Sequence, residues 1–201
     1  RMLLVTGGAG FIGSNVVAAL NDAGRDVVVC DVLGQDGKWR NLAKRRLADF
    51  VPPSELMDWL KGRRLEAVIH LGAISETTAT DGAVVIETNF RLSMRLLDWC
   101  TANATPLIYA SSAATYGDGA QGMDDQDDDL ARLRPLNMYG YSKHLFDLYA
   151  QRSGWLSRIV GVTASNDAQI TTAVIITSQG DTIFPVDAAP LGGGGCFVLR
   201  C

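Results

Sequence analysis

Three residues in the second half of the chain have the types and spacing needed for proton transfer. Tyr139 and Lys143 form a Tyr-x-x-x-Lys motif, so a helix places the phenol and the ammonium on one face. A free phenol has a pKa of about 10 and is a poor base at neutral pH, whereas a neighbouring ammonium favours the phenolate. Ser112 follows an apolar run and can hydrogen-bond the same substrate oxygen. We therefore predict that Tyr139, Lys143 and Ser112 exchange a proton with a substrate hydroxyl or carbonyl.

A glycine-rich segment near the start of the chain has the spacing of a dinucleotide-binding loop. Gly7, Gly10 and Gly13 lie between an apolar run over 2–5 and an amphipathic segment over 15–23. Residues without a Cβ let a pyrophosphate approach the backbone, and the N-terminus of the following helix supplies amide donors and a favourable dipole. This order of strand, loop and helix predicts that the loop binds NAD or NADP.

The choice between NAD and NADP depends on charged residues that follow the second apolar run. Asp31 ends that run, where a carboxylate can bind both ribose hydroxyls of NAD and repel the 2′-phosphate of NADP. Lys38 and Arg40 follow closely and can neutralise that phosphate. The alternative interpretation of Lys38 and Arg40 is a pair of ordinary surface cations, so these residues alone leave both cofactors open.

The elements that must position these residues alternate between short β-branched runs and amphipathic segments. This alternation is typical of a parallel sheet covered by helices on both faces, and it predicts a doubly wound, Rossmann-type α/β fold. The expected strands cover residues 2–5, 26–30, 47–49, 67–71, 107–110 and 159–162. The expected helices cover residues 15–23, 84–100 and 141–151, and a further helix begins at Ser54. We predict an NAD(P)-binding Rossmann domain over residues 1–162 and a divergent tail over 163–201.

The bulk properties limit the class of protein. The 201 residues are 47% hydrophobic, enough for one core, and the formal net charge of −4 argues against a nucleic-acid binder. The four cysteines form no CxxC pair and there are only two histidines, so no metal site is expected. Cys30 and Cys100 are interpreted as core residues in a reducing compartment, and His144 as a surface residue. We expect a cytoplasmic protein without a signal peptide or membrane helix.

Longer segments narrow the prediction to a family. TGGAGFIGSN, LADF, HLGA and TNF fit any nucleotide-sugar epimerase or dehydratase, whereas KWRNL, SSAATYG and PLNMYGYSK are narrower. Together, over about residues 2–162, they resemble the ADP-L-glycero-D-manno-heptose 6-epimerases. These enzymes belong to the extended short-chain dehydrogenases/reductases, in the NAD-dependent epimerase/dehydratase family. Ala113 and Ala114 replace the Asp-Glu pair of the related 4,6-dehydratases, which favours an epimerase.

The resemblance implies an isomerase of lipopolysaccharide-core biosynthesis that inverts C6″ of ADP-heptose by transient oxidation with tightly held NADP. It implies that Tyr139 is an acid/base residue with Ser112 as its partner, and that Lys38 meets the 2′-phosphate. The residues that it assigns to the cofactor are Gly7, Gly10, Phe11, Ile12, Gly13, Asp31, Lys38, Asn89 and Lys143. The expected partner is ADP-heptose or a related nucleotide sugar, and a homo-oligomer stays open.

The resemblance ends after Val162. Such epimerases continue with a second acid/base lysine and a substrate domain, whereas Lys143 is the last lysine of this sequence. We interpret residues 163–201 as frameshifted sequence or as a shortened cap in place of that domain. The alternatives to an active epimerase are an inactive NADP-binding fragment and another nucleotide-sugar epimerase or dehydrogenase. Without the domain, we expect apolar surface near residues 72–78 and 112–117 to be exposed.

Overall fold

The main sheet of the protein is parallel through its first five strands. The computed structural model describes residues 2–122 and 129–154 with their side chains, and the backbone of 161–163, 173–176, 182–186 and 198–200. Within these residues, one sheet has the order β3-β2-β1-β4-β5-β9-β6. Its parallel strands are β1 (Met2–Thr6), β2 (Asp26–Cys30), β3 (Asp49–Val51), β4 (Ala67–His70) and β5 (Leu107–Ala110). The order reverses between β1 and β4, the position at which ligands bind in open α/β sheets.

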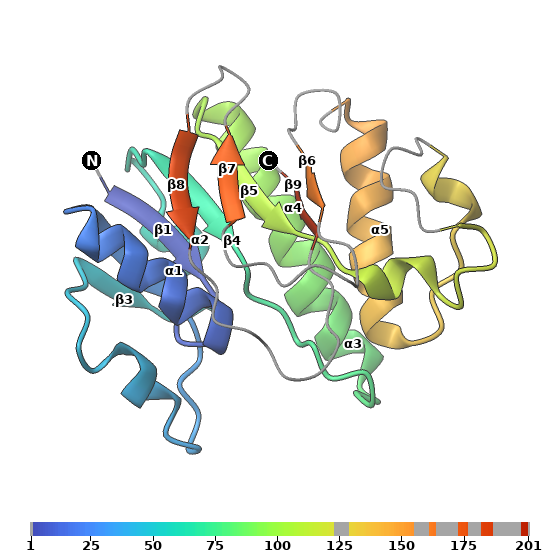
Figure 1. Ribbon diagram of the computed structural model, residues 1–201, viewed down its shortest axis with the longest axis horizontal. Coiled ribbons are helices and arrows are strands. Elements are labelled where there is room, and N and C mark those ends of the chain that lie inside the picture. The colour runs from blue at the N-terminus through green and yellow to red at the C-terminus, as the bar shows by residue number, and fades with distance from the viewer. Residues whose placement is uncertain are drawn as a thin grey trace.

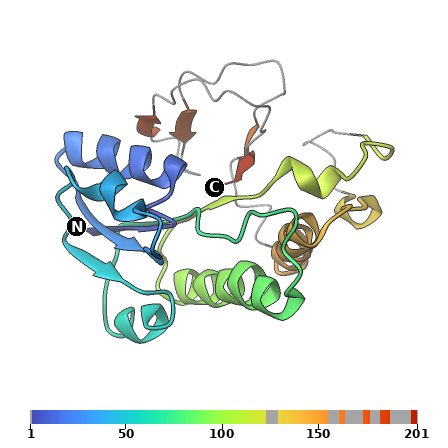
Figure 2. The ribbon, with the colours of Figure 1, turned by 90° about the horizontal axis from the view of Figure 1, so that it is seen from below.

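Helical segments connect the strands and cover both faces of the sheet (Figure 1). Figure 2 shows α1 on one side of the sheet and α2 with α4 on the other. The first segments are α1 (Phe11–Asp22), η1 (Lys38–Leu42), α2 (Leu56–Trp59), α3 (Gly82–Val85) and the π-helix η2 (Ile86–Arg91). The later ones are α4 (Leu92–Ala102), η3 (Ala113–Tyr116), η4 (Leu130–Arg132) and α5 (Met138–Arg152). Within the described residues, no helix is long and apolar enough to cross a membrane.

The core consists of two layers, one on each face of the sheet. Successive strand side chains point to opposite faces, so Leu3 and Val5 pack on the α1 side and Leu4 packs on the other. On the α1 side they meet buried residues of that helix, including Val17 and Leu20. Both faces are buried, which explains why the strand sequences are continuous apolar runs rather than alternating ones.

The segments after residue 160 add strands at two places. β6 (Gly161–Thr163) and β9 (Val198–Arg200) extend the main sheet, and β9 pairs antiparallel with both β5 and β6. β7 (Ala173–Ile176) and β8 (Thr182–Val186) form an antiparallel pair on the α1 side of the sheet (Figure 2). The sixth predicted strand, 159–162, lies partly outside the described residues, and the domain boundary at 162 stays a prediction.

The predicted fold class is confirmed, while some element boundaries were wrong. The third strand covers Asp49–Val51 rather than 47–49, because its pairing with β2 runs from Asp49 opposite Val28 to Val51 opposite Cys30. The long helix predicted over 84–100 is interrupted by the π-helical turn η2. His144 is 6% exposed, so its interpretation as a surface residue was wrong.

The expected exposed apolar surface is also absent from the two segments named for it. Tyr116 is buried because it packs with Leu130 and Leu133 against the η3–α5 region. Ser112 and Thr115 are buried as well. In the other segment, the exposed residues 75–78 are polar or charged. The expectation of exposed apolar surface at 72–78 and 112–117 was therefore wrong.

Candidate active site

The glycine loop turns so tightly that side chains would block it. Gly7 has φ 68° and donates its amide to the carbonyl of Cys30 at 2.8 Å. A Cβ on Gly7 would lie 2.8 Å from the backbone of Gly72, at the end of the neighbouring β4. A Cβ on Gly13 would overlap the carbonyl oxygen of Gly7. These two glycines therefore let the end of β1, the loop and α1 approach one another.

The start of α1 offers backbone amides to an anion. Gly10 is the N-cap, and within this described helix no side chain caps the first amides and no acidic residue occupies the first turn. Phe11 and Ile12, the first two helical residues, are 57% and 36% exposed. The helix dipole adds partial positive charge at the same end. The loop therefore fits the pyrophosphate of a dinucleotide, as the sequence predicts.

Asp31 is committed to the loop before any ligand binds. Its side chain is almost buried, and its Oδ2 accepts the amide of Ala9 at 2.8 Å. Its Oδ1 accepts the amide of Val32 at 2.7 Å and the Nζ of Lys38 at 2.6 Å. Lys38 is thus an ion-pair partner of Asp31, rather than the separate surface cation of the alternative interpretation.

Asn41 is a second support of the loop, and sequence reasoning did not identify it. Its Nδ2 donates to the carbonyl of Ala9 at 2.8 Å, so both backbone polar groups of Ala9 are held by side chains. Asn41 lies in η1, within the KWRNL motif that narrowed the sequence resemblance to one family. The KWRNL motif could have drawn attention to Asn41, but it did not indicate which group the asparagine binds.

A catalytic corner forms where the end of β5 meets the start of α5. We use this name for Ser112, Tyr139 and Lys143. Asn137 caps α5 by accepting the amide of Gly140 at 2.8 Å, so Tyr139 lies in the first helical turn. A Cβ on Gly140 would lie 2.5 Å from the carbonyl oxygen of Ala114, so this glycine lets α5 approach η3. The approach brings Tyr139 within hydrogen-bond reach of Ser112.

Lys143 is the buried member of the corner and is 2% exposed. Its Nζ donates to the carbonyl of Ala110 at 2.9 Å and lies 4.8 Å from the centre of the Tyr109 ring. Burial lowers the pKa of Lys143 from 10.5 to about 8, and the charge of Asp147 opposes that shift. An ammonium held in this way is mostly charged at neutral pH and close to its titration range.

Tyr139 is held as the protonated phenol. Burial raises its pKa, the hydrogen bond with Ser112 lowers it, and the charge of Asp147 raises it. The sequence argument favoured the phenolate, and the structure differs because removal from water disfavours the charged form more than the Ser112 bond stabilises it. Tyr139 therefore carries its proton at neutral pH in this structure.

A buried polar chain connects the end of β1 to α4. The hydroxyl of Ser93 donates to the carbonyl of Asn89 at 2.5 Å, so the Nε2 of His70 must donate to Ser93, 2.8 Å away. The Nδ1 of His70 is then the acceptor for the hydroxyl of Thr6 at 2.6 Å. Burial, aided by the charge of Lys143, lowers the pKa of His70 from 6.5 to about 3. His70 is thus neutral, with its proton on Nε2.

Asn89 lies in the π-helical turn and is fully buried. Its side chain makes two hydrogen bonds to the backbone of Ile74. The Oδ1 accepts the Ile74 N–H at 2.8 Å, and the Nδ2 donates to the Ile74 carbonyl at 2.9 Å. It also donates to the hydroxyl of Ser142 at 2.9 Å. Asn89 therefore fastens the segment after β4 to the catalytic helix, and its predicted contact with a cofactor stays a prediction.

The family follows from a comparison with known proteins. The profile of the NAD dependent epimerase/dehydratase family matches residues 3–165. The chain belongs to this family. The matched range includes both the glycine loop and the catalytic corner, so the two residue groups that suggest chemistry lie in the part of the chain that defines the family.

A curated relative is the ADP-L-glycero-D-manno-heptose-6-epimerase of Nitratidesulfovibrio vulgaris strain Hildenborough. It is 48% identical over 170 residues, which are 82% of this chain and 53% of that protein. The chain spans about half the length of the curated relatives it matches.

Two solved structures share the fold. The Helicobacter pylori enzyme of the same name has a TM-score of 0.65 at 27% identity, covering 76% of this chain and 51% of that one. A Thermus thermophilus UDP-glucose 4-epimerase, solved with NAD, has a TM-score of 0.62 at 28% identity. The latter match covers 77% of this chain and 51% of the other.

Within this epimerase/dehydratase fold, the predicted site residues fall into two groups. Gly7, Gly10, Gly13, Asp31 and Lys38 gather at the ends of β1 and β2. Ser112, Tyr139 and Lys143 gather at the end of β5. Both groups lie at the carboxyl ends of parallel strands, at the same edge of the sheet.

Proposed function

We propose that this chain binds NADP and carries acid/base residues for inverting C6″ of ADP-heptose. The observation that carries the proposal is the corner itself, in which the start of α5 brings Tyr139 close to Ser112 and the buried Lys143 bonds to the carbonyl of Ala110. The glycine loop at the same sheet edge supports it, because it fits a dinucleotide. The 48% identity to a relative named ADP-L-glycero-D-manno-heptose-6-epimerase supports the choice of sugar nucleotide.

The mechanism assigns one proton path to this corner. Tyr139 and Ser112 bind the same oxygen on C6″, and a proton passes between that oxygen and the phenol as the carbon is oxidised or reduced. NADP held by the glycine loop would supply a reversible hydride acceptor for C6″. Inversion requires the carbonyl to present its other face before the hydride returns, so there is no net redox change. The raised pKa of Tyr139 suits the reductive half, in which the carbonyl oxygen gains a proton.

NADP is preferred over NAD in this proposal because of the Lys38–Asp31 ion pair. A free carboxylate at this position would repel the 2′-phosphate, but Lys38 lies 2.6 Å from Asp31 and neutralises it. The side chain of Lys38 is 30% exposed, which leaves the ammonium accessible to a phosphate. In this arrangement Asp31 orients the lysine, and Lys38 supplies the phosphate contact.

A cytoplasmic location is a further part of the proposal. Cys30 and Cys100 are free and buried, and burial raises the pKa of each thiol to about 12. Thiols of this kind behave as small core residues, and they suit a reducing compartment.

The second candidate is a cofactor-binding protein without full turnover. It is favoured by the extent of the family match, which ends at residue 165 and includes the glycine loop and the catalytic corner but not the segment that follows them. Both candidates require the same glycine loop and differ only in conversion of the sugar.

The deciding experiment is incubation of the purified chain with ADP-D-glycero-D-manno-heptose and NADP, followed by chromatographic separation of the C6″ epimers. Conversion that Tyr139→Phe abolishes would support the epimerase. NADP binding without conversion would select the second candidate. Absence of NADP binding would contradict both candidate functions. The control is a Lys44→Met variant, which changes an exposed lysine.

A further inference from the structure

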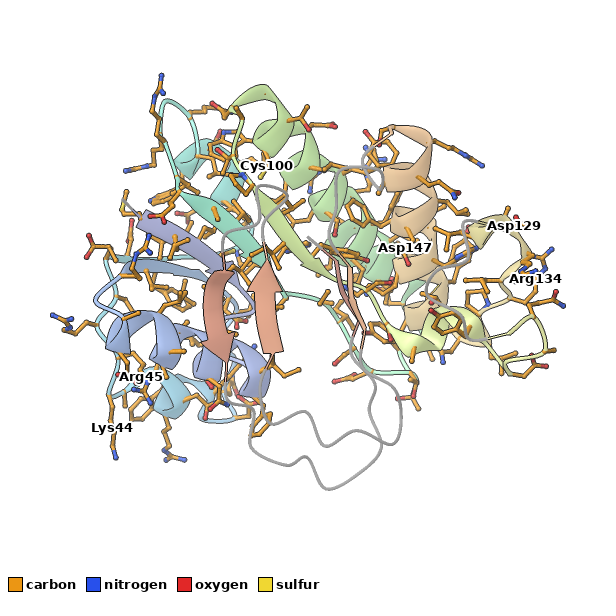
Figure 3. The ribbon with its side chains drawn as sticks, turned by 45° about the horizontal axis from the view of Figure 1, so that its top comes forward. Lys44, Arg45, Cys100, Asp129, Arg134 and Asp147 are labelled. Atoms are coloured by element: carbon orange, nitrogen blue, oxygen red, sulfur yellow. The ribbon has the colours of Figure 1, made fainter. Side chains whose placement is uncertain are left out.

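A buried carboxylate on α5 neither gives nor takes a proton in the path described above, although its charge adds to the raised pKa of Tyr139. Asp147 is 2% exposed and lies one helical turn beyond Lys143. Its Oδ2 accepts the hydroxyl of Ser111 at 2.6 Å. It lies on the side of α5 that faces the sheet (Figure 3). Asp and Glu are almost never this buried unless they are paired or hydrogen-bonded, so the burial of Asp147 needs an explanation.

Three consecutive residues at the end of β5 each hold one residue of α5. Lys143 Nζ donates to the Ala110 carbonyl at 2.9 Å, and the Ser111 hydroxyl donates to Asp147 Oδ2 at 2.6 Å. The Ser112 side chain lies close enough to Tyr139 to lower its pKa. The second of these bonds is the one that the proposed reaction does not need. This bond fixes the end of β5 relative to α5 at a point one helical turn after Lys143, whereas Tyr139 lies one turn before Lys143.

The two adjacent serines therefore have different tasks. Successive residues of an extended segment point to opposite sides, so Ser112 and Ser111 meet different parts of α5. Ser112 meets Tyr139 in the first turn, whereas Ser111 meets Asp147 two turns later. The Ser-Ser pair that marks the corner in the sequence thus supplies one side chain to the candidate reaction site and one to its support.

Asp147 is also the anion that acts on Lys143 within the described residues. The other groups that interact with Lys143 are His70 from β4 and Tyr109 from β5. His70 is neutral and Tyr109 faces the ammonium with its ring, so neither of them supplies a negative charge. A buried ammonium without a compensating charge is strongly disfavoured, which makes this carboxylate the counter-charge of Lys143.

We propose that Asp147, anchored by Ser111, is a positioning residue that keeps Lys143 charged and directed at the end of β5. The assignment of Lys143 to the cofactor rests on the proposed function, whereas the charge coupling between Asp147 and Lys143 does not. The direction of the coupling agrees with this geometry, since Asp147 raises a pKa that burial lowers to about 8. Without Asp147, the pKa of Lys143 would fall further below its ordinary value.

The test is a direct titration of Lys143 in the full chain by ¹³C NMR of lysine labelled at Cε. The sequence has only four lysines, so the signal of Lys143 is assigned by its loss in Lys143→Arg. Asp147→Asn keeps an acceptor for Ser111 and removes only the charge. We expect it to lower the pKa of Lys143 by about one unit or more, with the other three lysines unchanged.

The matched control is Asp98→Asn, which removes an exposed carboxylate from α4 and should leave the Lys143 titration unchanged. Ser111→Ala removes the anchor but keeps the charge, so it should lower the pKa by a smaller amount. An unchanged Lys143 pKa in folded Asp147→Asn would overturn the proposal.

Asp147→Glu decides the question if the asparagine variant does not fold. Retention of the charge should keep the Lys143 pKa within about 0.3 units of the parent, and a fall of about one unit would count against a charge role. The NMR titration needs no turnover and no added cofactor. A failure of the epimerisation assay therefore leaves this result intact, and the two proposals fail separately.

Discussion

The glycine loop and the catalytic corner are held in place by different kinds of interaction. The glycine loop is held mainly by backbone groups and by close approaches of Gly7 and Gly13, with Asp31 and Asn41 bonded to Ala9. The catalytic corner is held by buried titratable groups around Lys143, several of which have displaced pKa values. The loop is therefore sensitive to shape, whereas the corner is sensitive to charge and pH.

The largest effect should follow from a methyl group in the loop. In Gly13→Ala the new Cβ would overlap the Gly7 carbonyl, so α1 must move away from the loop. We expect NADP affinity to fall by at least about 100-fold, or ~2.7 kcal/mol, measured by calorimetric titration. Gly82→Ala is the control, because its Cβ would meet Met138 at an ordinary 3.6 Å. Affinity within about threefold of the parent would show that the loop tolerates the change.

The second effect tests the pH sensitivity of the buried groups around Lys143, through His70. The folded pKa of His70 is about 3 against 6.5 for a free histidine, so its contribution to stability is complete above about pH 6.5 and is lost as the pH falls toward 3. Between pH 7 and pH 5 this loss amounts to about 2 kcal/mol in the free energy of unfolding by urea. His70→Gln should remove that pH dependence, while His144→Gln should leave most of it. An equal loss in parent and His70→Gln would contradict the neutral, buried state.

A third effect, of similar size, separates the corner from the loop. Gly140→Ala places a Cβ 2.5 Å from the Ala114 carbonyl and pushes α5 from η3. We expect unfolding to become easier by about 1–3 kcal/mol, with NADP affinity changed by less than about threefold. Urea unfolding and calorimetry measure the two quantities on one preparation. A large loss of NADP affinity with unchanged stability would mean that the two ends are not independent.

The smallest effect concerns the choice of cofactor. Lys38→Met should weaken NADP binding by about tenfold and NAD binding by less than about threefold, because only NADP presents a phosphate to the ammonium. Lys44→Met is the control, since Lys44 is exposed and points away from the molecule (Figure 3). Equal losses for the two cofactors would mean that Lys38 acts only through Asp31.

The contrast between loop and corner also explains which parts of the site were predictable. Glycine spacing, the Tyr139–Lys143 motif and the apolar runs act through local geometry, so the sequence was enough to predict the parallel sheet and both residue groups. Asn41 and Ser93 act through partners far away in the chain, and no local pattern indicates such a bond. Those positions required the structure.

Charge states were the least predictable property. The Tyr-x-x-x-Lys spacing indicates that a lysine is near Tyr139, but the protonation state depends on how far burial removes both groups from water. Asp147 illustrates the same limit, because four positions after Lys143 a carboxylate looks like an ordinary helix-surface ion pair. Only its 2% exposure and its bond to Ser111 separate it from that interpretation.

The most direct test of the account is a calorimetric titration of the purified chain with NADPH. A preformed glycine loop predicts saturable binding of one NADPH per chain, with NADH weaker and the Gly13→Ala variant weaker still. Absence of saturable binding by either nucleotide at about 1 mM, in a chain shown to be folded, would contradict the central claim that these residues form a dinucleotide site.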